Sequence, residues 1–124
     1  MKYFALATLA FVLMSGAARA DGDAVKGEKV SKACMACHSL ADKTNKVGPS
    51  LVGVVGRKVA SVEGFNYSDS MKEFAATGAV WDEATLSKYL ENPKALVAKT
   101  KMAFAGLKKE GDRADLIAFL KTKM

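Results

Sequence analysis

The chain places two cysteines and a histidine within one pentapeptide, Cys34-Met35-Ala36-Cys37-His38, and has no other residue of either type. This motif constrains the fold more than any other feature, because few kinds of chemistry use such a spacing and each needs its own scaffold. A zinc site needs about four ligands, so these side chains would have to recruit carboxylates. A redox-active dithiol belongs at a helix start after a strand, and no strand pattern precedes Cys34. A plain structural disulfide is a further alternative.

The pentapeptide fits covalent attachment of haem, because Cys-x-x-Cys-His is the attachment signature of c-type haem. Two thiols on one helical turn can each add across a vinyl group on one edge of a porphyrin. The next residue then presents its imidazole to the iron. We therefore predict one haem c, held by thioether bonds from Cys34 and Cys37. His38 is the expected proximal iron ligand and has no competing histidine.

The first twenty residues differ from the rest of the chain and resemble a secretory signal peptide. Lys2 gives a charged start, residues 4–14 are apolar apart from Thr8, and Ala18-Arg19-Ala20 has the small-x-small pattern that signal peptidase accepts. The apolar run is well short of the roughly 20 residues that span a bilayer. We predict cleavage after Ala20, one domain over residues 21–124, a periplasmic location and no integral membrane span. An uncleaved leader acting as an anchor is the alternative.

The charge balance favours an acidic partner. The full chain has 19 − 13 = +6, and removal of Lys2 and Arg19 with the leader leaves 17 − 13 = +4. An exported protein rarely meets nucleic acid, and the lysines are not interleaved with aromatic residues as in a strand-binding groove. We expect acidic protein surfaces as partners, no nucleic acid, and a monomer.

The remaining pattern predicts an all-α fold, with about four to five short helices and irregular loops wrapped around the haem. Apolar periodicity and capping residues predict helices over 23–32, 68–76 and 82–91, and a last helix that opens at Gly111-Asp112. Residues 39–64 are rich in glycine and small residues and predict an irregular loop, and the stretch after Pro93 is also expected to be irregular.

Gly27 lies inside the first predicted helix, where glycine costs about 1 kcal/mol relative to alanine. A close helix crossing would explain its presence. The most available partner is the last helix, which carries Phe119 on its apolar face.

Met102 is the candidate for the second axial position of the iron, since no second histidine exists. Unlike a core methionine on a helical stripe, it lies in an irregular stretch between Lys101 and Ala103. Methionine ligation would close the iron to substrates and make the protein a one-electron carrier. If Met102 is not a ligand, the open position would suit an enzyme, such as a small haem peroxidase, or a gas-binding protein.

Taken in order, these segments resemble the class I cytochromes c, most closely the mitochondrial type and bacterial cytochrome c2. The resemblance covers nearly all of residues 23–122. The segments that carry it are the haem motif, Lys46-Val47-Gly48-Pro49-Ser50-Leu51, Gly56-Arg57-Lys58, Gly64-Phe65-Asn66-Tyr67-Ser68, Tyr89-Leu90-Glu91-Asn92-Pro93-Lys94, Thr100-Lys101-Met102-Ala103-Phe104-Ala105-Gly106 and Asp115-Leu116-Ile117-Ala118-Phe119-Leu120-Lys121. Ala98-Lys99 departs from the Pro-Gly pair common before Thr-Lys-Met, so we expect a more mobile ligand loop in which Lys99 or Lys101 displaces Met102 at high pH.

The resemblance implies roles for further residues. The carbonyl of Pro49 would accept the proton of the proximal imidazole, while Tyr89 and Thr100 would lie near Met102. Propionate contacts would come from Arg57, Tyr67 and Trp81. The family docks through lysines that ring the exposed haem edge, and the residues similar to that ring are Lys46, Lys94, Lys99, Lys101, Lys108 and Lys109.

The function that this resemblance implies is electron transfer without catalysis. The partners implied are a membrane quinol-oxidising complex of the bc1 type on one side, and a terminal oxidase or photosynthetic reaction centre on the other. A dedicated acceptor for one periplasmic dehydrogenase would have the same physical features and is the alternative within this class.

Overall fold

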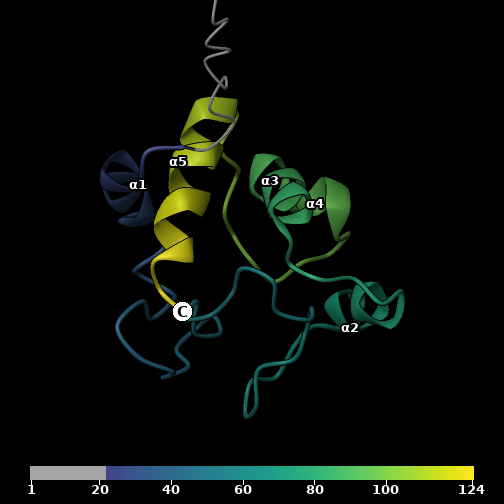
Figure 1. Ribbon diagram of the computed structural model, residues 1–124. Helices are drawn as coiled ribbons and strands as arrows, with labels where there is room; N and C mark the ends of the chain where they lie inside the picture. Colours follow the sequence, from purple (N-terminus) through teal and green to yellow (C-terminus); the bar gives the residue numbers. More distant parts are fainter. Residues whose placement is uncertain (1–21) are drawn as a thin grey trace, which may run out of the picture.

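A computed structural model describes residues 22–124 as short helices joined by irregular loops (Figure 1). The helices are α1 (Ala24–Ser31), α2 (Asp69–Ala76), α3 (Glu83–Glu91), α4 (Pro93–Leu96) and α5 (Glu110–Lys121). Within this part of the chain no strand forms, and one isolated antiparallel bridge joins Lys58 and Val80. The predicted all-α class is confirmed. The predicted signal peptide, 1–20, lies outside the described residues, as does Asp21, the first residue of the predicted mature domain.

Short polar side chains start α1, α2 and α3, three of the four described helices that are capped in this way. Asp23 accepts hydrogen bonds from the amides of Val25 and Lys26 and so caps α1. Ser68 caps α2, and Asp82 caps α3. Each cap satisfies amides that have no partner within the helix, so each helix begins one residue after the cap. The predicted helices 23–32, 68–76 and 82–91 therefore included their own capping residues.

Two elements differ from the sequence-based prediction. The stretch after Pro93 was expected to be irregular but begins with the short helix α4, where the Asn92 side chain accepts from the amide of Ala95. Proline at the first helical position has the right φ and needs no amide donor, so the same Asn-Pro pair ends α3 and begins α4. The last helix begins at Glu110, one residue before Gly111.

Helices α1 and α5, the first and last helices of the described chain, pack against each other (Figure 1). Gly27 lies at the crossing, where an added Cβ would overlap the carbonyl of Asp115 and crowd the Cβ of Phe119. The expected contact between Gly27 and the last helix is confirmed. Ser31 is also buried there, and its hydroxyl donates to the carbonyl of Glu28 within α1 at 2.6 Å.

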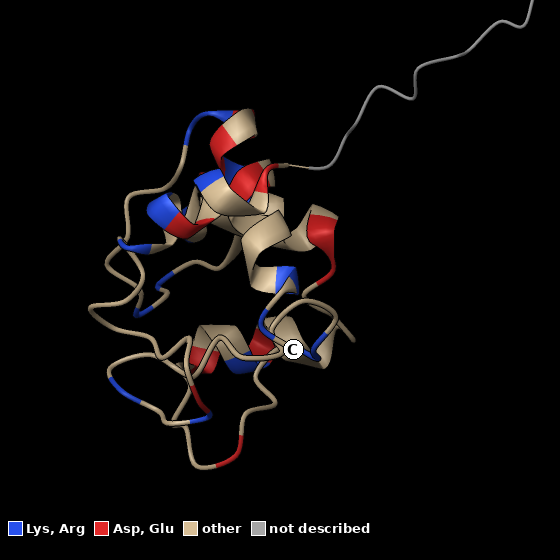
Figure 2. Ribbon diagram, turned by 60° about the vertical axis from the view of Figure 1, so that its left-hand side comes forward, with Lys and Arg blue, Asp and Glu red and all other residues tan. Residues whose placement is uncertain are grey.

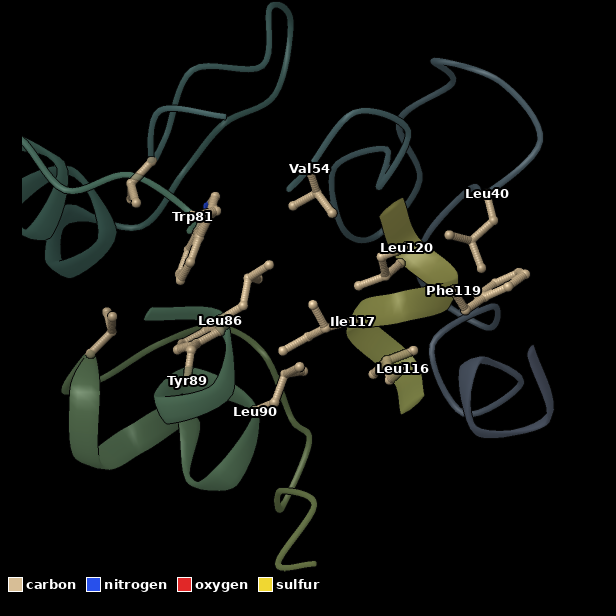
Figure 3. Packing of buried hydrophobic residues seen from close by; sticks show 12 residues of the cluster. Leu40, Val54, Trp81, Leu86, Tyr89, Leu90, Leu116, Ile117, Phe119 and Leu120 are labelled. Atoms are coloured by element: carbon tan, nitrogen blue, oxygen red, sulfur yellow. The ribbon is translucent and has the colours of Figure 1, made fainter. Parts of the chain in front are cut away.

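The core is built from α3, α5 and the loops rather than from α1 or α2. Figure 3 shows Leu86 and Leu90 of α3 pointing toward Ile117 and Leu120 of α5. The buried apolar set is Leu40, Val54, Val59, Trp81, Leu86, Tyr89, Leu90, Val97, Leu116, Ile117, Phe119 and Leu120. Cys34 and Met102 both pack against this cluster while remaining partly exposed. The predicted haem-attachment turn and the predicted second iron ligand therefore border the same core.

Replacement of Gly27 by alanine should lower the free energy of unfolding by about 1–3 kcal/mol, because the crossing has no room for a methyl group. Gly111→Ala is the matched control, since nothing lies within 4 Å of the position that its methyl group would take. That variant should be neutral or more stable by about 0.5–1 kcal/mol through backbone entropy. Urea unfolding followed by circular dichroism measures both. Equal effects of the two substitutions would contradict a tight crossing.

Candidate functional site

The Cys-x-x-Cys-His motif forms turns that continue directly from α1. The amide of Cys34 donates to the carbonyl of Ser31 at 2.8 Å, and the amides of Cys37 and His38 both donate to the carbonyl of Cys34, at 3.2 and 3.0 Å. The two thiols are free, with Cys34 half-buried and Cys37 exposed. Burial raises the pKa of the Cys34 thiol, and the nearby Cys37 raises it further. The two cysteines therefore lie on one compact turn and are not joined by a disulfide.

The imidazole of His38 is oriented by the loop that follows it. Its Nδ1 donates to the carbonyl oxygen of Pro49 at 2.6 Å, which is the bond that the family resemblance implies. Gly48 packs against the ring so closely that an added Cβ would lie 2.6 Å from Nδ1, and its amide donates to the carbonyl of Cys37 at 2.8 Å. Burial lowers the pKa of His38, the hydrogen bond to Pro49 raises it, and Arg57 lowers it. With Nδ1 committed as a donor, Nε2 is the ring nitrogen left as an acceptor or metal ligand.

A network of polar side chains that the sequence did not single out shapes this loop. The hydroxyl of Ser50 donates to the carbonyl of Asp42 at 2.6 Å, and that of Ser39 donates to the Asp42 carboxylate at 2.9 Å. Bonds from Thr44 and Ser39 lower the pKa of the Asp42 carboxyl group. The side chain of Asn45 joins Glu63 and Ser50. Short polar residues in a loop are common, so their spacing alone gives no signal that they hold Pro49 in place.

Arg57 has a donor without a partner. Its Nη1 donates to the carbonyls of Ser50 and Val52, at 2.9 and 3.3 Å. Its Nε is buried and has no hydrogen-bond partner in the structure. Burial lowers the pKa of this guanidinium, and Tyr67 opposes that shift. Since buried donors are normally paired, the free Nε indicates a place for an external acceptor such as a carboxylate.

The other two predicted propionate contacts have different surroundings. The hydroxyl oxygen of Tyr67 accepts from the amide of Val62 at 3.1 Å, which leaves its own O–H free to donate elsewhere. Trp81 is buried, with ring centroids 6.0 Å from Phe74 and 5.0 Å from Tyr89. The described contacts of Trp81 are therefore with aromatic rings, and its proposed role as a propionate donor stays a prediction.

Met102 is half-buried in the irregular segment between α4 and α5. Its amide donates to the hydroxyl of Thr100 at 3.4 Å, and a 2.7 Å hydrogen bond joins that hydroxyl to the hydroxyl of Tyr89. Burial raises the pKa of Tyr89, and the bond to Thr100 lowers it. The structure thus places Tyr89 and Thr100 in one hydrogen-bonded group with Met102, the neighbourhood that the resemblance implies.

Lys99, just before these residues, has φ +58°, a left-handed conformation that costs a residue with a Cβ about 1–2 kcal/mol. In the family that the chain resembles, glycine is common at this position, and glycine adopts a positive φ without strain. Lysine in its place therefore leaves the backbone of residue 99 strained.

The six candidate docking lysines are all exposed. Two of them make hydrogen bonds to carbonyls, Lys101 to Asn66 at 3.5 Å and Lys108 to Glu91 at 2.9 Å. Figure 2 shows basic residues on the loops and on the helices alike, with acidic residues mainly on the helices and on the loop at the bottom of that view. The charges are therefore mixed over much of the surface rather than confined to one block.

These residues fit a covalently bound haem. The structure provides two cysteines on one turn that are not joined by a disulfide, an imidazole whose Nδ1 is held by Pro49 so that Nε2 is left available, and a buried guanidinium donor that lacks an acceptor. Within residues 22–124 no group of three or more His, Cys, Asp or Glu residues could hold a metal ion, and the thiols of Cys34 and Cys37 are not joined. The zinc and disulfide alternatives therefore find no support there.

The comparisons with known proteins agree with this site. Residues 24–123 match the sequence profile of the family described as Cytochrome c. The chain is 53% identical to a cytochrome c2 of Rhodomicrobium vannielii over 99% of this chain and 98% of the relative. It is 54% identical to a cytochrome c-550 of Ancylobacter novellus over 78% of this chain and 92% of that one. A solved structure of cytochrome cH from Methylobacterium extorquens is similar with a TM-score of 0.75 and 44% identity, over 82% of this chain and 100% of that chain.

Lys99→Gly should raise the free energy of unfolding by about 1 kcal/mol, because glycine adopts the left-handed conformation without the Cβ clash. Lys99→Ala removes the same amine but keeps the clash, so it should be within about 0.5 kcal/mol of the parent. Chemical unfolding of both variants measures the difference. If both substitutions changed stability equally, the charge of Lys99 and not its backbone would be responsible.

Proposed function

Since this chain belongs to the cytochrome c family, we propose that it is a periplasmic one-electron carrier. It would accept electrons from a membrane quinol-oxidising complex of the bc1 type and donate them to a terminal oxidase or photosynthetic reaction centre. Like its family, the chain is a small electron-transfer protein rather than an enzyme, and its cofactor is covalently bound haem c. When bound, the haem supplies an iron that takes up and releases one electron.

The observation that carries this proposal is the 2.6 Å hydrogen bond from Nδ1 of His38 to the carbonyl of Pro49. It fixes the tautomer and the plane of the imidazole, which leaves Nε2 as the ligand atom. Cys34 and Cys37 would form the two thioether bonds on the turn directly before it. Arg57, Tyr67 and Trp81 would meet the propionates, with the unpartnered Nε of Arg57 as the clearest donor for a buried carboxylate.

Met102 would provide the second axial ligand, with Thr100 and Tyr89 holding its segment in place through the hydrogen bonds described above. A thioether is a soft ligand that favours ferrous iron and raises the reduction potential relative to a second histidine. Two protein ligands leave no coordination position for a substrate. The chain would then need only to accept one electron and pass it on with little rearrangement.

Two features support the location and the partners. Residues 1–20 have the pattern of a secretory leader, and in the described part of the chain none of the helices has the length and hydropathy to cross a bilayer. The lysines Lys46, Lys94, Lys99, Lys101, Lys108 and Lys109 are exposed, so they are available to acidic surfaces of redox complexes.

The main test is the absorption spectrum of the holoprotein after periplasmic expression. Reduced c-type bands and the weak near-infrared band of methionine on ferric haem should both be present, and Met102→Ala should remove only the second. Met71→Ala is the matched control, because Met71 also packs partly buried against the core but lies on α2. Loss of the near-infrared band in Met71→Ala, or its absence from the parent protein, would refute ligation by Met102. Rapid carbon monoxide binding to the parent protein would instead favour an open-site haem enzyme.

Docking through the lysine ring predicts a charge effect that depends on position. Lys46→Glu with Lys94→Glu should slow reduction by a quinol-oxidising complex about tenfold at low salt, because steering by complementary charge raises association rates by roughly 10 to 10³. The control pair, Lys26→Glu with Lys29→Glu on α1, changes the net charge equally at two exposed sites outside the ring. Its effect should be several times smaller, and high salt should remove both effects. Equal slowing by the two pairs would indicate that overall charge, not a docking ring, controls the rate.

A further inference from the structure

Arg113 is a buried charged residue to which the sequence assigned no role. It lies on α5 among the apolar core residues and is only 8% exposed. Its Nε donates to the hydroxyl of Ser87 on α3 at 3.0 Å. Its Nη1 donates to the carbonyls of Leu107 and Lys108, at 2.9 and 3.0 Å. One guanidinium therefore connects α5 to α3 and to the segment between Met102 and α5.

All three acceptors of Arg113 are neutral. Among the described residues no carboxylate forms an ion pair with it, and the one ion pair seen there joins Lys121 and Glu83. Taking a charge out of water is costly, and two of the three bonds that offset the cost here go to backbone carbonyls of a loop. A general role in packing α5 would be served at lower cost by an apolar side chain of similar volume. Two of the guanidinium's hydrogen bonds go to the carbonyls of Leu107 and Lys108, so its arrangement suits a residue that holds this loop.

The residues that Arg113 contacts are also fixed to the end of α3. The amide of Leu107 donates to the carbonyl of Leu90 at 2.7 Å, and Nζ of Lys108 donates to the carbonyl of Glu91 at 2.9 Å. Gly106 packs so closely on the same carbonyl of Glu91 that it has no room for a Cβ. Residues 106–108 are thus clamped between α3 and α5.

The chain between this clamp and Met102 has little support of its own. In the described structure the backbone amides of residues 103–106 donate no hydrogen bond. On the other side of Met102, the support comes from the bonds among Met102, Thr100 and Tyr89. The position of Met102 therefore depends on anchors at the two ends of its segment, one centred on Tyr89 and the other on Arg113.

We propose that Arg113 is a positioning residue for Met102, which acts by holding residues 107 and 108 so that the ligand segment stays closed. The inference rests on the proposed ligation by Met102. Loss of the guanidinium should leave the helices in place but raise the fraction of molecules in which Met102 has left the iron. An external ligand then binds more tightly, because its apparent affinity increases with the population of the open form.

The experiment measures the dissociation constant of imidazole for the ferric holoprotein by absorption, together with the near-infrared methionine band and urea unfolding by far-ultraviolet circular dichroism. Arg113→Met keeps an unbranched side chain, although a shorter one, and removes every donor. Arg113→Lys keeps the charge but replaces the fork by a single nitrogen. Ser87→Ala is the matched control, since it removes the α3 contact of the same guanidinium and leaves both loop bonds possible.

We expect imidazole to bind about tenfold more tightly to Arg113→Met, a change of about 1.4 kcal/mol. Arg113→Lys should fall between that variant and the parent, and it serves as the test if Arg113→Met does not fold. Ser87→Ala should lower the urea midpoint while its imidazole affinity stays within about twofold of the parent.

Two results would overturn the proposal. One is an imidazole affinity within about twofold of that of the parent in every folded Arg113 variant. The other is an increase in imidazole affinity in Ser87→Ala that is as large as the increase in the Arg113 variants. The second result would mean that packing of α3 on α5 controls the loop. A parent protein without the methionine band refutes ligation by Met102 itself, so failure of the two proposals can be distinguished.

Discussion

The crossing of α1 and α5 is the contact on which the arrangement of this small domain depends. Isolated helices of this length are marginal in water, so each needs tertiary packing to form. At Gly27 the two backbones approach as closely as an absent side chain permits. The amide of Asp23 also donates to the Asp115 carboxylate at 2.8 Å, which ties the start of α1 to α5. Because the Cys-x-x-Cys-His turn leaves α1 directly, this crossing also determines where the thiols and His38 lie relative to the core.

Two arginines differ in how their side-chain donors are paired within the protein. Arg113 uses its Nε and Nη1 on acceptors within the protein and holds α3, α5 and the Met102 segment together. Arg57 has the same kind of Nη1 contacts to loop carbonyls, but its buried Nε has no partner. A donor held in place with nothing to bond to is what a site for propionate carboxylates requires, because its cost is recovered only when an acceptor arrives.

The segment that carries Met102 combines firm anchors with local strain. Tyr89 and Arg113 hold its two ends through hydrogen bonds, whereas Lys99 has a left-handed backbone that disfavours a residue with a Cβ. Such strain persists only where the surroundings hold it, and it lowers the cost of opening that part of the chain. We therefore expect the stability of this domain to be uneven, with a tight terminal crossing and a segment around Lys99 that opens more readily.

Features whose cause is local could be predicted from the order of residues alone. The motif of Cys34, Cys37 and His38 specifies its chemistry through spacing within one turn, and Asp23, Ser68 and Asp82 cap helices through amides two or three residues away. The resemblance to the class I cytochromes c extended the prediction to the hydrogen bond between His38 and Pro49 and to the cluster around Met102. The short helix α4 was missed because an Asn-Pro pair signals both the end of one helix and the start of another.

Other properties follow from contacts between residues that are distant in sequence. The free Nε of Arg57 and the burial of Arg113 cannot be read from their neighbours in the chain, since an arginine is most often exposed. Each arises because α3, α5 and the loops meet around one small core and enclose whatever lies between them. Short-range hydrogen bonding and covalent chemistry depend on adjacent residues, whereas desolvation and backbone strain depend on which segments pack together.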